Sequence, residues 1–115
     1  MTNQNVQDKS FAFAIRIVNL SKYLQSEKKE FVLSKQVLRS GTSIGANLSE
    51  AQQAQSRADF TSKLNIALKE ATETQYWLRL LHATGYLDSH EFESLYCDCD
   101  ELVKILVTSI KTIKQ

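Results

Sequence analysis

The chain has 115 residues, enough for one domain with one hydrophobic core. With three glycines and no proline, it lacks the turn-forming residues that a β-rich fold of this length needs, so its composition favours a few long helices. Lysine and arginine number 14 against 13 aspartates and glutamates, so the net charge of +1 does not by itself favour nucleic acid or a membrane as a partner.

The beginning of the chain and its cysteine usage bear on its location. The first ten residues lack the basic and then apolar pattern of a signal peptide, and no apolar run approaches the roughly 20 residues of a membrane span. Cys97 and Cys99 are the only cysteines, too few for a zinc site of the usual spacing. We therefore expect a cytoplasmic protein that binds no metal and no cofactor, in which both cysteines are small packing residues.

Four segments have helical periodicity, and we expect them to form a single domain over residues 1–115: about residues 6–25, 30–54, 57–84 and 88–114. Because their connections are short, the expected fold is all-α, an antiparallel up-down-up-down four-helix bundle. The first segment carries one apolar row at spacings of four, three and four: Phe13, Ile17, Leu20 and Leu24. A second row widens its apolar face: Phe11, Ile15 and Val18.

The second segment contains "GTSIG", which matches the G-x-S-x-G pattern of a hydrolase nucleophile elbow. Such an elbow needs a strand before it and an α/β sheet beneath it. Here a single helical row of small and apolar residues runs through the pattern: Val37, Gly41, Ile44, Leu48 and Ala51. We therefore expect a helix, and no catalytic role for Ser43.

Two glycines inside a helix each cost roughly 1 kcal/mol relative to alanine, so they need a reason. Gly41 and Gly45 are four residues apart, with Ser40, Ala46 and Ser49 close by. Small residues at this spacing let a neighbouring helix approach closely.

The last two segments have clear start and stop signals. Ser56 and Asp59 are spaced as a capping pair, Gly85 suits the left-handed position after a helix, and Asp88 with Glu91 restarts the chain as a helix. The apolar row of the third segment is Phe60, Leu64, Ala67, Ala71, Leu78 and Leu81. That of the fourth is Phe92, Leu95, Cys99, Leu102, Leu106, Ile110 and Ile113.

A polar row borders the apolar row of the second segment: Gln36, Arg39, Ser43, Asn47 and Glu50. The third segment offers a matching row: Ile66, Glu70, Glu73, Trp77 and Leu80. We expect a partly buried structural network in which Arg39 pairs with Glu70 or Glu73, and Ser43 and Asn47 add hydrogen bonds. The alternative is a carboxylate pair acting as acid and base. It lacks a nucleophile and a metal-binding pair of histidines, so we expect no enzyme and no small-molecule substrate.

The stretches "VLRSGTSIGANLSEA" and "KLNIALKEATETQYWLRLLHATGYL" resemble the four-helix bundle family named for proteins encoded in 23S rRNA intervening sequences. The resemblance covers roughly residues 8–112, and its signature is Arg39, Ser40, Ser43, Ile44 and Asn47 together with Glu50. Ala51 departs from the family pattern, in which many relatives have glycine. The resemblance implies an up-down bundle that assembles as a ring, often a pentamer, with no established enzyme activity. Similar bundles serve as accessory proteins of diversity-generating retroelements, where a basic ring meets nucleic acid and a partner protein.

Two functions remain open. One is a nonenzymatic homo-oligomeric adaptor that binds RNA or a ribonucleoprotein; the other is a purely protein-binding or structural oligomer. Assembly is expected in both, because one bundle interior can bury only part of the apolar and small-residue surface of the first two segments.

Up-down topology predicts where RNA would bind. It would bring five cations to one end of the bundle: Lys9, Arg57, Lys63, Lys111 and Lys114. Against Asp8 and Asp59 this gives a local net charge of 5 − 2 = +3, which a ring would repeat into one basic face. The simpler alternative is that Lys111 and Lys114 only complement the C-terminus of a helix.

Overall fold

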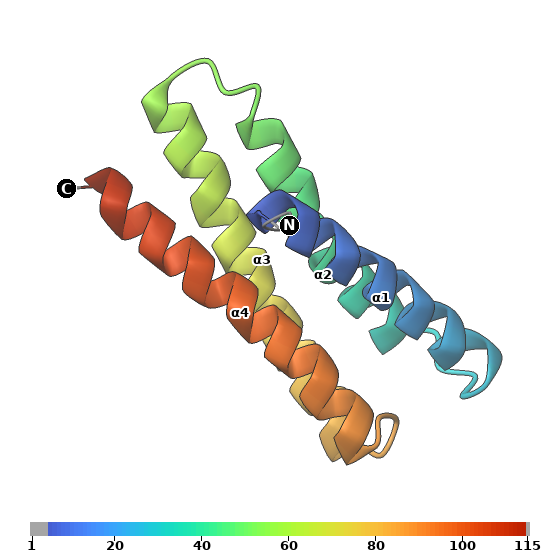
Figure 1. Cartoon of the computed structure of the whole chain (residues 1–115). Helices are drawn as coiled ribbons and strands as arrows, with labels where there is room; N and C mark the ends of the chain where they lie inside the picture. The colour runs from blue at the N-terminus through green and yellow to red at the C-terminus, as the bar shows by residue number, and fades with distance from the viewer. Residues whose placement is uncertain (1–4, 115) are drawn as a thin grey trace.

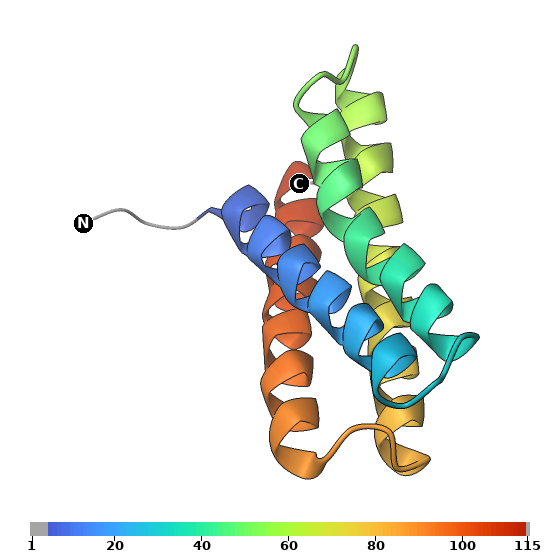
Figure 2. The same cartoon turned by 90° about the vertical axis from the view of Figure 1, so that its right-hand side faces the viewer.

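The computed structural model describes residues 5–114 and contains four α-helices, α1 (Val6–Ser26), α2 (Leu33–Ala51), α3 (Arg57–Ala83) and α4 (Ser89–Lys114) (Figure 1). Consecutive helices pack side by side, and α4 returns to α1 through the smallest of the four interfaces. The expected all-α up-down bundle is confirmed. Figure 2 shows α1 and α2 together in front of α3 and α4.

The core is built from the apolar rows that the sequence predicts. In α1 and α2 every expected core residue is buried, with at most 6% of its surface exposed. In α3 and α4 the rows are also buried, except that Phe60, Phe92 and Ile113 at the helix ends are only partly covered. The second row of α1 is different: Phe11 and Ile15 are exposed, and Val18 is half-buried.

The two glycines of α2 allow α1 to lie directly on the α2 backbone. A Cβ atom at Gly41 would lie 2.8 Å from both Cγ atoms of Ile17, and one at Gly45 would lie 3.1 Å from the Ser10 hydroxyl. The expected close approach is confirmed, and the approaching helix belongs to the same chain. The glycines therefore serve the packing of α1 on α2 within one chain.

The second helix is shorter than the expected residues 30–54, and Glu30 explains its start. The Glu30 carboxylate accepts hydrogen bonds from the backbone N–H groups of Val32, Leu33 and Ser34, at 3.2, 3.0 and 2.7 Å. It thus caps the free N–H groups of α2 from outside the helix. At the other end, residues 52–53 form a turn after Ala51, which is 2% exposed.

The remaining helix ends match the predicted signals. The Ser56 hydroxyl accepts from Asp59 N–H, and the Asp88 carboxylate accepts from Glu91 N–H. Gly85 has φ +87°, the left-handed conformation that favours glycine after a helix.

The two cysteines have different environments. Cys99 is buried and its thiol donates to the Ala71 carbonyl oxygen, so its packing role is confirmed. Burial, and then the charges of Asp100 and Asp98, raise the pKa of this thiol to about 12. Cys97 is exposed, so the expectation that it packs inside was wrong. The two side chains of a pair separated by one residue lie on different sides of a helix.

Replacing Gly41 with alanine should destabilise the protein. The new methyl group would overlap the two branches of Ile17, which is fully buried and cannot move aside. Overpacking of this kind costs about 1–3 kcal/mol, and the better helix propensity of alanine returns about 1 kcal/mol. We expect a net loss of about 1–2 kcal/mol in urea unfolding. The matched control is Gly45→Ala, whose new contact is a hydroxyl 3.1 Å away; an equal loss in both variants would contradict this assignment.

The Glu30 cap should make stability depend on pH. Desolvation raises the pKa of this carboxyl, but the N–H groups of Leu33, Ser34 and Val32 outweigh it and hold its pKa below the usual 4.5. A lowered folded pKa stabilises the fold above pH 4.5, and this stabilisation is lost as the pH falls through the folded pKa. Glu30→Ala should therefore cost about 1 kcal/mol at pH 7, as loss of a cap does, and progressively less below pH 4.5.

Urea unfolding of Glu30→Ala at several pH values measures this effect. The control is Glu27→Ala, which removes an exposed carboxylate from the same connection. A loss that is independent of pH would argue against the cap.

Candidate functional site

The predicted ion pair between α2 and α3 forms, but at the surface. Arg39 donates to the carboxylates of Glu70, at 3.2 Å, and of Glu73. The Arg39 side chain is 49% exposed, whereas those of Glu70 and Glu73 are 17% and 31% exposed. The network was expected to be partly buried. The two acids are, but Arg39 is half exposed, because a long side chain can place its guanidinium over the acids from the solvent side.

The other members of the predicted network do not join this pair. Ser43 and Asn47 donate to carbonyl oxygens of their own helix, those of Arg39 and Ser43, at 2.6 and 2.8 Å. These carbonyls lie one turn back, within easier reach than a neighbouring helix. Gln36 is exposed, and Glu50 pairs instead with Lys63 at 2.9 Å. This carboxylate raises the pKa of the Lys63 ammonium.

A buried hydroxyl pair links the same two helices, and sequence reasoning missed it. The hydroxyl oxygens of Ser40 and Thr74 are 2.9 Å apart, and both residues are fully buried. Thr74 continues the apolar row of α3, three residues after Ala71 and four before Leu78. A threonine at that spacing is the signal that could have identified it.

Two aromatic side chains of α3 lie beside the Arg39 ion pair. The indole N–H of Trp77 donates to the Glu73 carboxylate at 3.0 Å. Tyr76 meets Trp77 edge to face with 5.1 Å between ring centroids, and it is 53% exposed. We call Arg39, Tyr76, Trp77 and the exposed Ile66 the α2–α3 patch. Arginine, tyrosine and tryptophan are the residues most enriched at the energetic centres of protein interfaces.

A second apolar surface lies between α1 and α2. Phe11 is 69% exposed and Ile15 is 50% exposed. Phe11 lines a groove of about 510 Å³, together with Ala14 of α1 and Ala46 of α2. We call Phe11, Ile15 and Ala46 the α1–α2 patch.

Of the five predicted RNA-contacting cations, Lys9 does not lie at the shared end of the bundle. Lys9 pairs with Glu101 at 2.7 Å, and Glu101 precedes the end of α4 by 13 residues, or about 20 Å of helix. The start of α1 therefore lies beside the middle of α4 and not at its end (Figure 1). Lys63 pairs with Glu50 as described. Without Lys9 and Asp8, which lie away from this end, and with Glu50 added, the local sum falls from +3 to 4 − 2 = +2.

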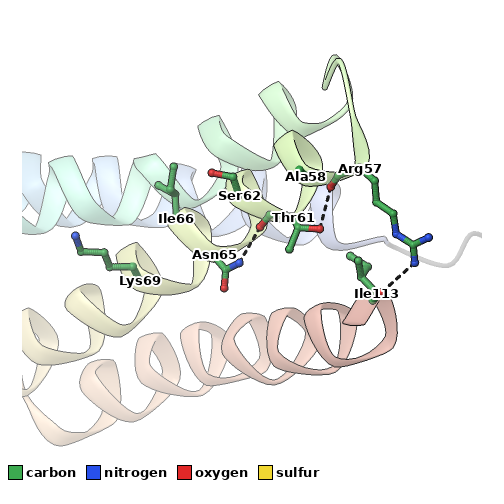
Figure 3. Close-up of a pocket in the computed structure, with 8 residues that line it drawn as sticks. All are labelled: Arg57, Ala58, Thr61, Ser62, Asn65, Ile66, Lys69 and Ile113. Atoms are coloured by element: carbon green, nitrogen blue, oxygen red, sulfur yellow. Dashed lines mark hydrogen bonds between the residues drawn. The ribbon is translucent and has the colours of Figure 1, made fainter. Parts of the chain in front are cut away.

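Arg57 is engaged with the end of α4. Its guanidinium donates to the backbone carbonyl of Ile113 at 2.9 Å, as Figure 3 shows, and so binds one of the unpaired carbonyls of that helix terminus. Both residues line an open groove of about 770 Å³ on α3, in which Lys69 is the other charged residue. Lys111 and Lys114 are exposed in the last turn of α4, and within residues 5–114 neither has a salt bridge.

Ion pairs also connect α1 to α4, and the sequence analysis did not find them. Arg16 lies 2.7 Å from Asp98 and 3.5 Å from Glu91, and Lys9 lies two turns earlier on the same side of α1. The spacing gave little signal: Lys9 and Arg16 are seven residues apart on α1, whereas their nearest partners, Glu101 and Asp98, are three apart on α4. These pairs cross the smallest interface of the bundle.

Two findings concern other classes of site. No group of three histidine, cysteine, aspartate or glutamate side chains within residues 5–114 is placed to hold a metal ion. None of the four helices is long and apolar enough to cross a membrane. His82 is half-buried and stacks on Phe92, with ring centroids 4.4 Å apart, whereas His90 is exposed.

The exposure of Arg39 sets the expected cost of removing it. Pairs at the surface contribute about 0–1 kcal/mol each, well below the roughly 3–5 kcal/mol lost when a buried pair is broken. Arg39→Ala in the isolated chain should therefore cost about 1 kcal/mol in urea unfolding at low protein concentration. A loss above about 3 kcal/mol under these conditions would show that the pair is buried. The comparison variant is Lys63→Ala, which removes the neighbouring exposed pair with Glu50.

Comparisons with known proteins agree on one family. Residues 2–108 match the family described as "23S rRNA-intervening sequence protein". A search of the curated proteins found no match. A crystal structure from Bacteroides thetaiotaomicron VPI-5482, described as a protein with unknown function from the S23 ribosomal protein family, is similar with 63% identity and a TM-score of 0.92. The similarity covers 93% of this chain and 99% of that one. The family matches nearly the whole length of the chain, and the chain folds as a four-helix bundle. This chain therefore belongs to the 23S rRNA-intervening sequence protein family.

Proposed function

We propose that this protein is a nonenzymatic adaptor that works as a cyclic homo-oligomer, with a pentamer as the expected form. The observation that carries the proposal is the presence of two exposed apolar patches on a bundle whose core is already filled. Phe11 is 69% exposed and lies one turn from the exposed Ile15, and Tyr76 is 53% exposed against Trp77, so neither is an isolated exposed side chain. Contiguous apolar surface of this kind marks sites of protein association.

The polar chemistry supports a binding role. Glu70 and Glu73 are both held by the Arg39 guanidinium, and Glu73 also accepts from Trp77. Carboxylates bound in this way are held in one orientation, which suits a structural cluster. The buried Cys99 thiol, with its raised pKa, is likewise suited to packing.

The mass of the protein in solution tests the proposal. A pentamer would have five times the 13.1 kDa of one chain, about 65 kDa. We expect size exclusion with light scattering to give this mass at micromolar concentration, because a stable interface buries more than about 1,000 Å². A single species of 13.1 kDa at that concentration would rule out the oligomeric adaptor.

RNA binding is a second candidate, and the exposed ends of Lys111 and Lys114 favour it. Within residues 5–114 these lysines have no salt bridge, and a ring would repeat them on one face. Contacts to phosphates through such lysines hold the backbone without reading sequence, and their affinity falls steeply as salt rises.

A titration of structured RNA against the wild type and the Lys111→Glu, Lys114→Glu double variant tests this candidate. At low salt we expect the double variant to bind at least tenfold more weakly, with a smaller dependence on salt. The control is Lys22→Glu, Lys35→Glu, which makes the same charge change at exposed positions far from the α4 terminus. Equal binding by all three proteins, or none, would leave the protein-only adaptor.

A further inference from the structure

We infer that the groove on α3 between Arg57 and Lys69 binds an acidic amphipathic helix of another protein. The inference rests on the proposed adaptor function and names one of its surfaces and the chemistry of the partner. The groove has a volume of about 770 Å³ and lies beside the end of α4, to which Arg57 is bonded. Figure 3 shows the two cations at opposite ends of the groove.

The charges that line the groove are all positive. Arg57 and Lys69 are 69 − 57 = 12 residues apart, which is about 18 Å along α3. Both are exposed, and within residues 5–114 neither has a salt bridge. No carboxylate among the described residues lines the groove. An acidic partner is therefore attracted to both ends.

The end of α4 adds charge of the same sign. Ile113 lines the groove, and Lys111 and Lys114 lie in the same last turn of that helix. The nearest acid along α3 is Asp59, whose carboxylate accepts from a backbone N–H. With the two cations of the groove, these groups sum to 4 − 1 = +3.

The surface between the two cations is apolar, and this favours a protein over nucleic acid as the partner. Apolar atoms make up most of the groove surface, including those of Ala58 and Ile66. Two polar side chains in the middle are already used within α3. The Thr61 hydroxyl donates to the Arg57 carbonyl oxygen at 2.9 Å, and the Asn65 amide donates to the Thr61 carbonyl oxygen at 3.0 Å. A phosphate backbone needs donors along its path, whereas the apolar face of a helix gains from covering apolar surface.

Arg57 is oriented before any partner binds. Its guanidinium donates to the Ile113 carbonyl oxygen at 2.9 Å, which fixes it across the contact between α3 and α4. A guanidinium has five N–H donors, so others remain available to a carboxylate. A side chain that is already fixed loses little entropy when it binds.

A second copy of this chain does not supply such a helix, because most of its acids are engaged. Of the 13 acids in the chain, seven form salt bridges and three accept from backbone N–H groups at helix starts, so that 7 + 3 = 10 are used. The other three are Asp8, Glu27 and Glu93. No two of these lie three turns apart on one helix, as the 18 Å between the groove cations requires.

An 18-residue helical peptide tests the inference. Its two glutamates are 11 positions apart, about 17 Å of helix, and two leucines lie between them on the same face. The control peptide has glutamine in place of both glutamates. Fluorescence anisotropy at low salt measures the affinity of the wild-type protein for each. We expect the glutamate peptide to bind at least tenfold more tightly than the control, and its binding to weaken as salt rises.

Variants of the groove separate charge from shape. Arg57→Glu, Lys69→Glu reverses both ends and should weaken binding of the glutamate peptide at least tenfold. Lys69→Glu alone keeps the contact of Arg57 with α4 and should weaken it at least threefold. Ala58→Gln fills the exposed floor without a change of charge and should also weaken it at least threefold. The matched control, Lys22→Glu, Lys35→Glu, changes charge at exposed positions of α1 and α2 and should keep the affinity within twofold.

A structured RNA hairpin titrated against the same proteins tests the other class of partner. A wild type that binds the hairpin but not the glutamate peptide at up to about 1 mM would overturn the inference. Equal binding of the two peptides, or unchanged affinity in Ala58→Gln, would overturn it as well. Circular dichroism melts verify that the variants are folded.

These outcomes are separate from the test of the proposed oligomer, which is its mass. An oligomeric wild type that does not bind the glutamate peptide would overturn only the groove assignment. A monomeric wild type that binds the peptide, with the expected loss in the groove variants, would overturn the oligomer and support the groove assignment.

Discussion

The contact between Ile17 of α1 and the bare backbone of α2 at Gly41 determines how the other surfaces of the bundle are arranged. Without a Cβ atom on Gly41, α1 can lie so close to α2 that Ile17 is completely removed from water. The core row of α1 is thereby directed inward. Phe11 and Ile15, which lie on another side of the same helix, are left outside. The same contact that completes the core therefore creates the surface that is available for association.

The position of α1 also explains the charged contacts on the opposite side. Because α1 packs closely on α2, its interface with α4 is the smaller of its two interfaces. The ion pairs of Lys9 and Arg16 lie in this smaller interface. Their side chains are partly exposed, so each pair contributes little to stability. The register of α1 along α4 is therefore set by the larger contact of α1 with α2, and the ion pairs match that register. This register is the reason that Lys9 lies beside the middle of α4.

The polar groups between α2 and α3 fall into two layers with different consequences. The inner layer is the Ser40–Thr74 hydroxyl pair, which satisfies two buried polar groups between the helices. The outer layer is Arg39 with its two glutamates, still half in contact with solvent. The hydrogen bond of the inner pair is complete within the chain. The half-exposed cluster beside Trp77 still has surface that a partner can cover. That distinction is why the outer layer is the better candidate for recognition.

The sequence by itself determined the number and order of the helices, the core rows, the caps at Ser56 and Asp88, and the close approach at Gly41. These features depend on spacing along one helix or on local backbone chemistry, and both follow directly from the order of residues. The sequence also predicted the Arg39 ion pair, because facing rows of neighbouring helices can be matched by their charges. The start of α2 was misjudged because Glu30 caps the helix from outside through its side chain, and periodicity cannot distinguish such a residue from a helical one.

Only the tertiary structure decided which predicted site residues lie together. The basic end was inferred as if all helices began and ended at the same level, but close packing of α1 on α2 places Lys9 beside Glu101. Whether Arg39 is buried likewise depends on how far its side chain extends over Glu70, which the position of its Cα atom does not fix. Axial offsets between helices and the paths of long side chains arise from contacts across the whole bundle, and no local pattern encodes them.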